Sequence, residues 1–198
     1  MSGRPGLGRP VATSHAEIEE AAFRLFAERG FDATTLDAIA AEVGVGRRTL
    51  FRYFESKNDI PWGRFEDTLD GLRSLLESTP SDQPLWVSVH HAVVEFNRFD
   101  AAARPAHRLR MRLILTTPTL QAHSVLKYEA WRSVIAEHVA RRLDLGPRDL
   151  LPRTVAQVSL ALALSAYEQW LAEPDADLTA LIEQAMSQLR GFLDVSAG

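Results

Sequence analysis

The chain has 198 residues, of which 46% are hydrophobic and 24% are charged, so it is long enough to bury a core as one large domain or two small ones. It contains no cysteine, which excludes a disulfide scaffold, a thiolate zinc site, an iron–sulfur cluster and a cysteine nucleophile. Its formal net charge of −4 argues against a protein that coats nucleic acid with its whole surface, but it is compatible with a local basic patch.

Hydropathy gives no sign of a membrane segment. Residues 1–11 lack an apolar run, and the longest uncharged stretch, residues 154–167, is too short and too polar to cross a bilayer. We therefore expect a cytoplasmic protein with no membrane partner.

The first thirteen residues are rich in glycine and proline and carry Arg4 and Arg9. This composition predicts a flexible basic arm over residues 1–13, which is either a plain tail or an arm that enters a DNA minor groove. A helix follows, because Ser14 and Glu17 have the spacing of a capping box and the helical pattern continues to about residue 29.

Residues 34–54 predict two short helices joined by a tight turn. Thr35 can cap the first helix, and Gly44 ends it because glycine tolerates positive φ angles. Leu50 and Phe54 supply the inner face of the second helix. The pattern fits a helix-turn-helix that lays its second helix in a DNA major groove, and it also fits an αα-hairpin in an ordinary bundle.

Charge placement favours the helix-turn-helix. Eleven residues contain a single acid, Glu55, and four cations: Arg47, Arg48, Arg52 and Lys57. A solvated helix without a partner more often interleaves charges of both signs.

The rest of the chain has helical periodicity without any alternating strand pattern. A helix is expected from residue 57 to about residue 78, followed by helices near 85–99, 105–116, 119–143, 148–172 and 177–194. We predict an all-α protein with an N-terminal three-helix helix-turn-helix DNA-binding unit, residues 14–57, and a C-terminal helical ligand-binding and dimerisation bundle, residues 58–198.

The last two predicted helices are apolar over much of their circumference, so they need partners on several sides. They are either core helices within one chain or half of a four-helix interface between two copies. We favour the homodimer, with an interface formed by Ser159, Leu162, Ala163, Ala166, Leu181, Ala185, Met186 and Leu189.

A second group of cations lies in the body of the chain, within fifteen residues that contain one acid, Asp100. One interpretation is a solvated basic face that pairs with acids such as Glu129, Glu137 or Glu168. The other is an effector pocket with an apolar interior and a cationic mouth, which would admit an anionic amphipathic small molecule. The candidate effector-binding residues are Phe96, Arg98, Arg104, His107, Arg108, Arg112, Tyr128 and Trp131.

Catalytic motifs are missing from the sequence. It has no nucleophile elbow, no phosphate-binding loop and no dinucleotide fingerprint, and His91 with Glu95 makes only half of a metal site. We expect no catalytic residues, no metal and no cofactor. The alternative to a DNA-binding protein is a helical enzyme or carrier for an anionic amphipathic small molecule.

Residues 30–59 resemble the TetR-type transcriptional regulators of bacteria, through Gly30 to Ala40, Val43 to Val45, Thr49 to Phe54 and Ser56 to Asp59. The whole chain is similar to the regulators associated with mycofactocin gene clusters. The resemblance implies a homodimeric repressor that binds a palindromic operator in double-stranded DNA and is released by a small-molecule effector, with a long-chain acyl-coenzyme A as the candidate.

The resemblance also assigns DNA contacts. Base edges would be met by Arg47, Arg48 and Thr49, and phosphates by Thr35, Arg52, Tyr53 and Lys57. Phe51 replaces the tyrosine common in the family and leaves only an apolar contact, for instance with a thymine methyl group. Gly46 replaces a capping side chain at the start of the second helix.

Overall fold

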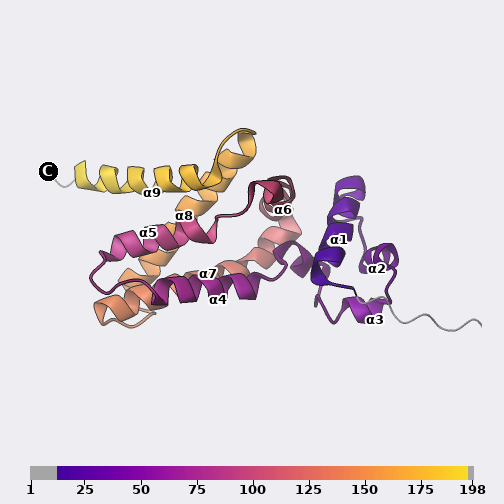
Figure 1. Ribbon diagram of the computed structural model, residues 1–198, viewed down its shortest axis with the longest axis horizontal. Coiled ribbons are helices and arrows are strands. Elements are labelled where there is room, and N and C mark those ends of the chain that lie inside the picture. The colour runs from indigo at the N-terminus through magenta and orange to yellow at the C-terminus, as the bar shows by residue number, and fades with distance from the viewer. Residues whose placement is uncertain (1–12, 196–198) are drawn as a thin grey trace, which may run out of the picture. The chain divides into compact units, whose positions relative to one another are not determined.

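The computed structural model describes residues 13–195, and side chains up to residue 193 (Figure 1). Within these residues the chain is all-α, as predicted. It divides into two compact units, one ending at Gly63 and one beginning at Arg64. The predicted arm lies outside the described residues, apart from Thr13.

The first unit contains α1 (His15–Arg29), α2 (Leu36–Val43), α3 (Arg47–Leu50) and the 3₁₀ helix η1 (Lys57–Trp62). The capping box that opens α1 is confirmed: the Glu17 amide donates to Ser14 Oγ and the Ser14 amide donates to the Glu17 carboxylate. The apolar sides of these helices meet in one small core, which buries Ile18, Leu25, Phe26, Phe31, Ile39, Leu50, Phe54 and Ile60.

The prediction of one helix from residue 57 to about residue 78 is wrong in its first part, because the structure has two elements there, η1 and α4 (Phe65–Glu77). Pro61 cannot donate a backbone hydrogen bond, and Gly63 has φ 54° and ψ −131°, a conformation that stops the helix. The boundary between the two units follows this break rather than residue 57.

The second unit contains α5 (Leu85–Phe96), the 3₁₀ turn η2 (Ala101–Ala103), α6 (Arg104–Thr116), α7 (Pro118–Leu143), α8 (Leu150–Ala172) and α9 (Leu178–Val195). These bounds agree with the predicted helices, except that α5 ends at Phe96. The long helices α7 and α8 pack together, α9 packs on α8 and α5, and α4 packs on α5 and α7 (Figure 1). Across residues 13–195, none of the helices combines the length and the apolar character needed to span a bilayer.

Candidate functional site

The turn between α2 and α3 has the geometry that the sequence predicts. Thr35 Oγ1 accepts a hydrogen bond from the Ala38 amide at 3.1 Å and so caps α2. Gly44 takes the left-handed conformation, with φ 76°, and the Val45 amide donates to the Ala40 carbonyl at 2.9 Å. This pattern closes the C-terminal end of α2 and returns the chain towards the core.

Helix α3 is short, and no side chain caps its first turn. Gly46 is its N-cap residue and offers no side-chain hydrogen bond. After Leu50 the chain continues in turns as far as Phe54, whose amide donates to the Leu50 carbonyl at 3.1 Å. The predicted recognition helix is therefore a single α-helical turn followed by looser turns.

Three basic side chains lie on the outer surface of this segment, and their surroundings differ. Arg47 pairs with the Asp37 carboxylate at 3.1 Å, and its guanidinium lies 5.5 Å from the centre of the Phe51 ring. Arg48 and Arg52 are exposed, and neither has a partner within residues 13–195. Thr49 is half-buried, and Phe51 is 42% exposed.

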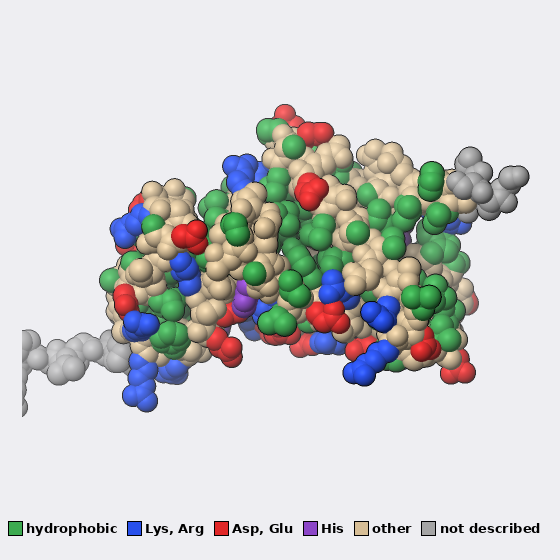
Figure 2. Space-filling model, turned by 180° about the vertical axis from the view of Figure 1, so that it is seen from behind, with side chains coloured by type: hydrophobic (Ala, Val, Ile, Leu, Met, Phe, Trp, Pro, Cys, Tyr) green, Lys and Arg blue, Asp and Glu red, His purple; other side chains and the backbone are tan. Residues whose placement is uncertain are grey.

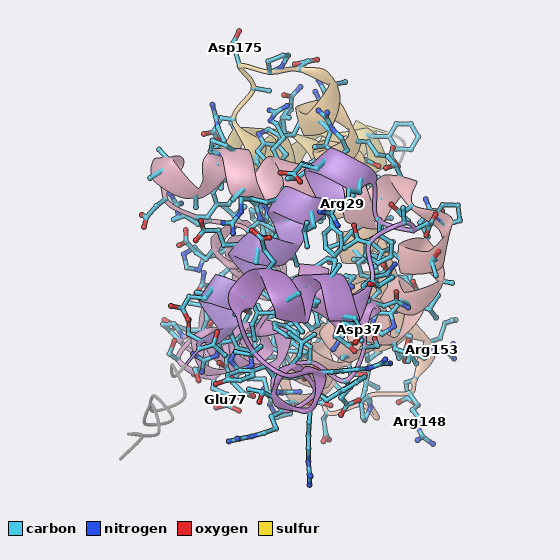
Figure 3. All side chains as sticks on the ribbon, turned by 90° about the vertical axis from the view of Figure 1, so that its right-hand side faces the viewer. Arg29, Asp37, Glu77, Arg148, Arg153 and Asp175 are labelled. Carbon is cyan, nitrogen blue, oxygen red and sulfur yellow. The ribbon has the colours of Figure 1, made fainter. Side chains whose placement is uncertain are left out.

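Asp37 is a residue of this surface that the sequence pattern did not predict. Figure 3 shows this residue on α2, and its carboxylate is the group that holds Arg47. The only sequence signal is an acidic residue in the first turn of α2, which alone predicts a favourable dipole interaction and nothing about Arg47.

Tyr53 connects the segment after α3 to the start of α1. Its hydroxyl donates to the Thr13 carbonyl at 2.6 Å, and its ring meets the edge of the His15 ring at 4.9 Å. Because the hydroxyl proton is already used, a phosphate contact by Tyr53 would replace this bond.

Lys57 also has a role within the first unit. Its ammonium donates to the carbonyls of Phe31, Asp32 and Thr34 at 2.7, 3.3 and 2.9 Å, and it lies 4.4 Å from the centre of the Phe31 ring. Partial burial lowers the pKa of Lys57, and the nearby Asp32 carboxylate opposes that shift. All three N–H donors are occupied, so Lys57 fastens the loop after α1 instead of presenting its charge outward.

In the second unit, three predicted effector-binding arginines hold other parts of the same unit. Arg98 pairs with Glu95. Arg104 donates to the Ala176 carbonyl at 2.9 Å, and Arg108 donates to the Glu173 carbonyl at 3.0 Å and stacks on Trp170 at 4.3 Å. The contacts of Arg104 and Arg108 fasten the turn between α8 and α9. These three arginines therefore bind other groups of the protein, as the first interpretation of the basic residues expects. Their partners, however, are backbone carbonyls and Glu95 rather than the expected acids.

Arg112 is different, because it is exposed and its guanidinium has no partner in the described residues. The pairing of Glu95 with Arg98 also removes half of the possible His91–Glu95 metal site. Residues 13–195 contain no group of three or more histidine, aspartate or glutamate side chains suited to hold a metal ion.

Among the aromatic candidates in the second unit, Trp131 is buried and the others are half-buried. Phe96 contacts Trp131, with ring centres 6.0 Å apart, and Trp131 is 3% exposed. His107 Nε2 lies 2.9 Å from the Tyr167 hydroxyl, which donates to Asn97 Oδ1 at 2.9 Å. Burial lowers the pKa of His107 to about 4, with a smaller contribution from Arg110. The pKa of the half-buried Tyr128 is raised, mainly by burial.

The residues predicted to form a dimer interface fall into two groups. Ser159, Ala163 and Ala166 are 4–5% exposed and belong to the chain's own core, where α8 meets its neighbours. The other five are half-buried: Leu162, Leu181, Ala185, Met186 and Leu189. An apolar hollow of about 540 Å³ between α5, α8 and α9 is lined in part by Trp86, Val158, Leu162, Met186, Leu189 and Leu193.

Family models match both parts of the chain. Residues 18–60 match the model described as bacterial regulatory proteins, tetR family, and residues 83–194 match the model described as the MftR C-terminal domain. A protein of Mycobacterium tuberculosis named as a mycofactocin biosynthesis transcriptional regulator, MftR, is 44% identical over 188 residues, which is 95% of each chain. The HTH-type transcriptional regulator TcmR of Streptomyces glaucescens is 29% identical over 94% of this chain and 87% of its own length.

Solved structures share the fold. The fatty acid degradation regulator FadR of Bacillus halodurans superimposes with a TM-score of 0.65 at 19% identity, over 89% of this chain and 97% of its own. FadR of Thermus thermophilus, a TetR-family repressor solved in complex with lauroyl-CoA, gives a TM-score of 0.57 at 22% identity, over 89% of this chain and 93% of its own.

Proposed function

Because the chain belongs to the TetR family of bacterial transcriptional regulators, whose named relatives are regulators and not enzymes, we propose that it is a repressor that binds a palindromic operator as a homodimer. Two copies related by a twofold axis would present two α3 segments to two half-sites of duplex DNA. A small-molecule effector in the second unit would release the protein.

The observation that carries the DNA-binding proposal is the pair of exposed, unpartnered arginines after the helix-turn-helix turn, Arg48 and Arg52. The forked N–H groups of an arginine match guanine O6 and N7, which suits Arg48 for a base edge. The same groups also bind phosphate oxygens, which suits Arg52 for a phosphate. Thr35 uses its hydroxyl oxygen as an acceptor from Ala38, so its hydroxyl proton can be donated to a phosphate at the positive end of α2.

The remaining contacts follow from the same surface. Arg47 would leave Asp37 to reach a base, and Phe51 would make apolar contact with a thymine methyl group. Thr49 would contribute a further contact at the edge of the same surface. We assign Lys57 and Tyr53 to positioning the loop and α1, since their donors are used within the unit.

Selection from random duplex DNA, followed by binding measurements over a range of salt concentrations, tests this proposal. We expect one inverted repeat to be enriched and its affinity to fall steeply with salt, because phosphate contacts release counterions. A chain that selects no sequence, or whose binding to duplex DNA does not depend on salt, is not an operator-binding protein.

For the effector, we propose a long-chain acyl-coenzyme A. The support is the shared fold with Thermus thermophilus FadR, which holds lauroyl-CoA, together with the aromatic interior around Phe96, Tyr128 and Trp131. Arg112 is the candidate for the anionic head group, because the guanidinium groups of Arg98, Arg104 and Arg108 already have partners. His107 would act as part of the interior wall.

Titrating a labelled operator complex with acyl-coenzyme A of increasing chain length tests the effector. Release should grow with chain length, and Arg112→Gln should weaken it without changing operator affinity. Thermodynamic linkage requires the effect to be reciprocal. The operator must lower the protein's affinity for the effector by the same factor by which the effector lowers the protein's affinity for the operator. Release that is the same at every chain length, or that does not occur, rules this effector out.

A further inference from the structure

A hollow of about 540 Å³ lies between α7 and α8, and its lining residues are not among those assigned to DNA or effector binding. Three arginines from different segments line it: Arg132 on α7, Arg148 in the loop before α8, and Arg153 on α8. We call it the arginine hollow. Its other lining residues are Glu129, Ser133, Ala136, Glu137, Pro147, Ala156 and Gln157.

Two of these arginines have side chains without a partner among residues 13–195. Arg132 pairs with Glu129 at 2.5 Å, whereas the guanidinium groups of Arg148 and Arg153 make no hydrogen bond or ion pair with any residue in that range. Figure 3 shows Arg148 and Arg153 on the same flank of the unit, with their side chains extending outward. Figure 2 shows basic and acidic side chains close together on the larger unit, seen from behind. Glu129 and Glu137 line the same hollow, yet the guanidinium groups of Arg148 and Arg153 pair with neither.

The loop that carries Arg148 is held by its own hydrogen bonds. Asp149 Oδ2 accepts from the Gly146 amide at 2.8 Å, and the Asp149 amide donates to the Gly146 carbonyl at 3.0 Å. The Leu145 amide donates to the Ala140 carbonyl at 2.9 Å and ties the loop to the end of α7. The Asp149 carboxylate is thus engaged within the loop, and the rim of the hollow is formed before any ligand arrives.

The lining restricts the chemistry of a ligand. Guanidinium forks suit a phosphate, and Ser133 can donate a further hydrogen bond to it. Glu137 would repel a purely anionic molecule, so the ligand must also carry hydroxyl or amine donors for this carboxylate. No aromatic side chain lines the hollow, so a nucleobase would find no ring on which to stack.

We propose that the arginine hollow binds a phosphorylated, polyhydroxylated metabolite of the sugar phosphate type. The phosphate would sit between Arg148 and Arg153, with Arg132 behind them, and a sugar hydroxyl would donate to Glu137. The apolar floor of Ala136, Ala156 and Pro147 leaves space for the carbon skeleton. The site would give the regulator a second small-molecule input.

Equilibrium dialysis of the full chain against labelled glucose 6-phosphate, without DNA or acyl-coenzyme A, tests the proposal. We expect saturable binding of one molecule per chain, no binding of glucose, and weaker binding of inorganic phosphate. Arg148→Ala with Arg153→Ala should lower the affinity at least about tenfold. The matched control, Arg64→Ala with Arg73→Ala, makes the same charge change at exposed arginines that pair with Asp67 and Asp70, and it should bind normally.

A second variant avoids removing charge. Gln157→Trp adds bulk at an exposed position of the lining and should block binding while circular dichroism stays unchanged. If the double arginine variant does not fold, ligand binding by the Gln157→Trp variant tests the proposal. Binding that survives in both variants, its absence in the natural chain, or equal binding of citrate would overturn the sugar phosphate assignment. Because no DNA is present, none of these outcomes bears on the operator proposal.

Discussion

At the scale of single residues, the two adjacent arginines Arg47 and Arg48 differ in the contacts that their side chains make before DNA binds. Arg47 must give up Asp37, whereas Arg48 is free to bind. We expect Arg48→Ala to cost about 1 to 3 kcal/mol at one base position and to relax preference there, and Arg47→Ala to cost less. Affinities for single-base variants of the selected operator measure both effects.

Asp37→Asn provides the control for this comparison. It removes the competing ion pair and should strengthen operator binding by a few tenths of a kcal/mol to about 1 kcal/mol, as expected for an exposed pair. If Arg48→Ala weakens all operator variants equally, Arg48 contacts phosphate and not a base.

Lys57 is predicted to act on stability. Lys57→Met keeps most of the side-chain stem but removes the charge that three carbonyls accept. Hydrogen bonds of this charged kind contribute about 1 to 3 kcal/mol, so the variant should unfold at a lower temperature. If its thermal stability is unchanged and its affinity for all DNA sequences falls alike, Lys57 contacts phosphate as the family resemblance implied.

The half-buried His107 and the buried His138 predict acid sensitivity. Burial lowers the pKa values of His107 and His138 to about 4, from 6.5 in an unfolded chain. The unfolded state therefore binds protons first as pH falls, and stability that is present above pH 6.5 is lost between pH 6.5 and 4, by on the order of 3 kcal/mol for each group.

Melting temperatures measured across this pH range check the expectation. His107→Gln, which retains a donor for the Tyr167 hydroxyl, should make the profile shallower, and His91→Gln at an exposed position should not. A natural chain whose melting temperature stays constant from pH 7 to pH 4 would contradict it.

At the scale of elements, the two glycines that frame the α2–α3 turn should respond in opposite directions. Gly44 has φ 76°, so Gly44→Ala forces a strained conformation at a cost of about 1 to 2 kcal/mol. Gly46 has φ −74° and ψ 150°, and a Cβ there would meet no atom within 4 Å. Gly46→Ser should cap α3 and stabilise the unit by about a few tenths of a kcal/mol, since glycine is already a tolerated N-cap residue.

Thermal unfolding of both variants gives the answer, and a helical signal that rises in Gly46→Ser would support a longer α3. If both substitutions destabilise the protein equally, the turn is not governed by these backbone angles.

Local signals explain which elements could be predicted. The capping box at Ser14, the cap at Thr35 and the left-handed Gly44 act within a few residues, so the bounds of α1 and α2 follow from sequence. The break at Pro61 and Gly63 is also local, but the start signal at Ser56 outweighed it in our prediction.

The site could be predicted only in part, because several of its contacts join distant positions. Lys57 reaches carbonyls 23 to 26 residues away, and Arg104 reaches one 72 residues away, and no spacing rule reports such pairs. A stripe of apolar residues along a helix likewise does not show whether it faces the chain's own core or a second copy. This ambiguity is why Ser159, Ala163 and Ala166 were assigned to an interface although they are buried in one chain.

At the scale of the whole molecule, the proposed homodimer needs a face that is apolar and exposed in the single chain. Val158 on α8 is 38% exposed and Phe192 on α9 is 67% exposed, so these positions can be changed without opening the core. Substituting Ala163 would not separate dimer loss from unfolding, because Ala163 is 5% exposed.

We therefore expect Val158→Glu with Phe192→Glu to yield folded monomers. A buried, unpaired carboxylate costs about 3 to 5 kcal/mol, so the dimer dissociation constant should rise at least about hundredfold. Operator affinity should fall with it, because two half-sites about 34 to 36 Å apart must be held by one dimer. The control, Val125→Glu with Leu126→Glu, changes two exposed positions of α7 and should sediment as a dimer. If the α8–α9 variant also remains dimeric and binds the operator normally, the two copies meet through another surface.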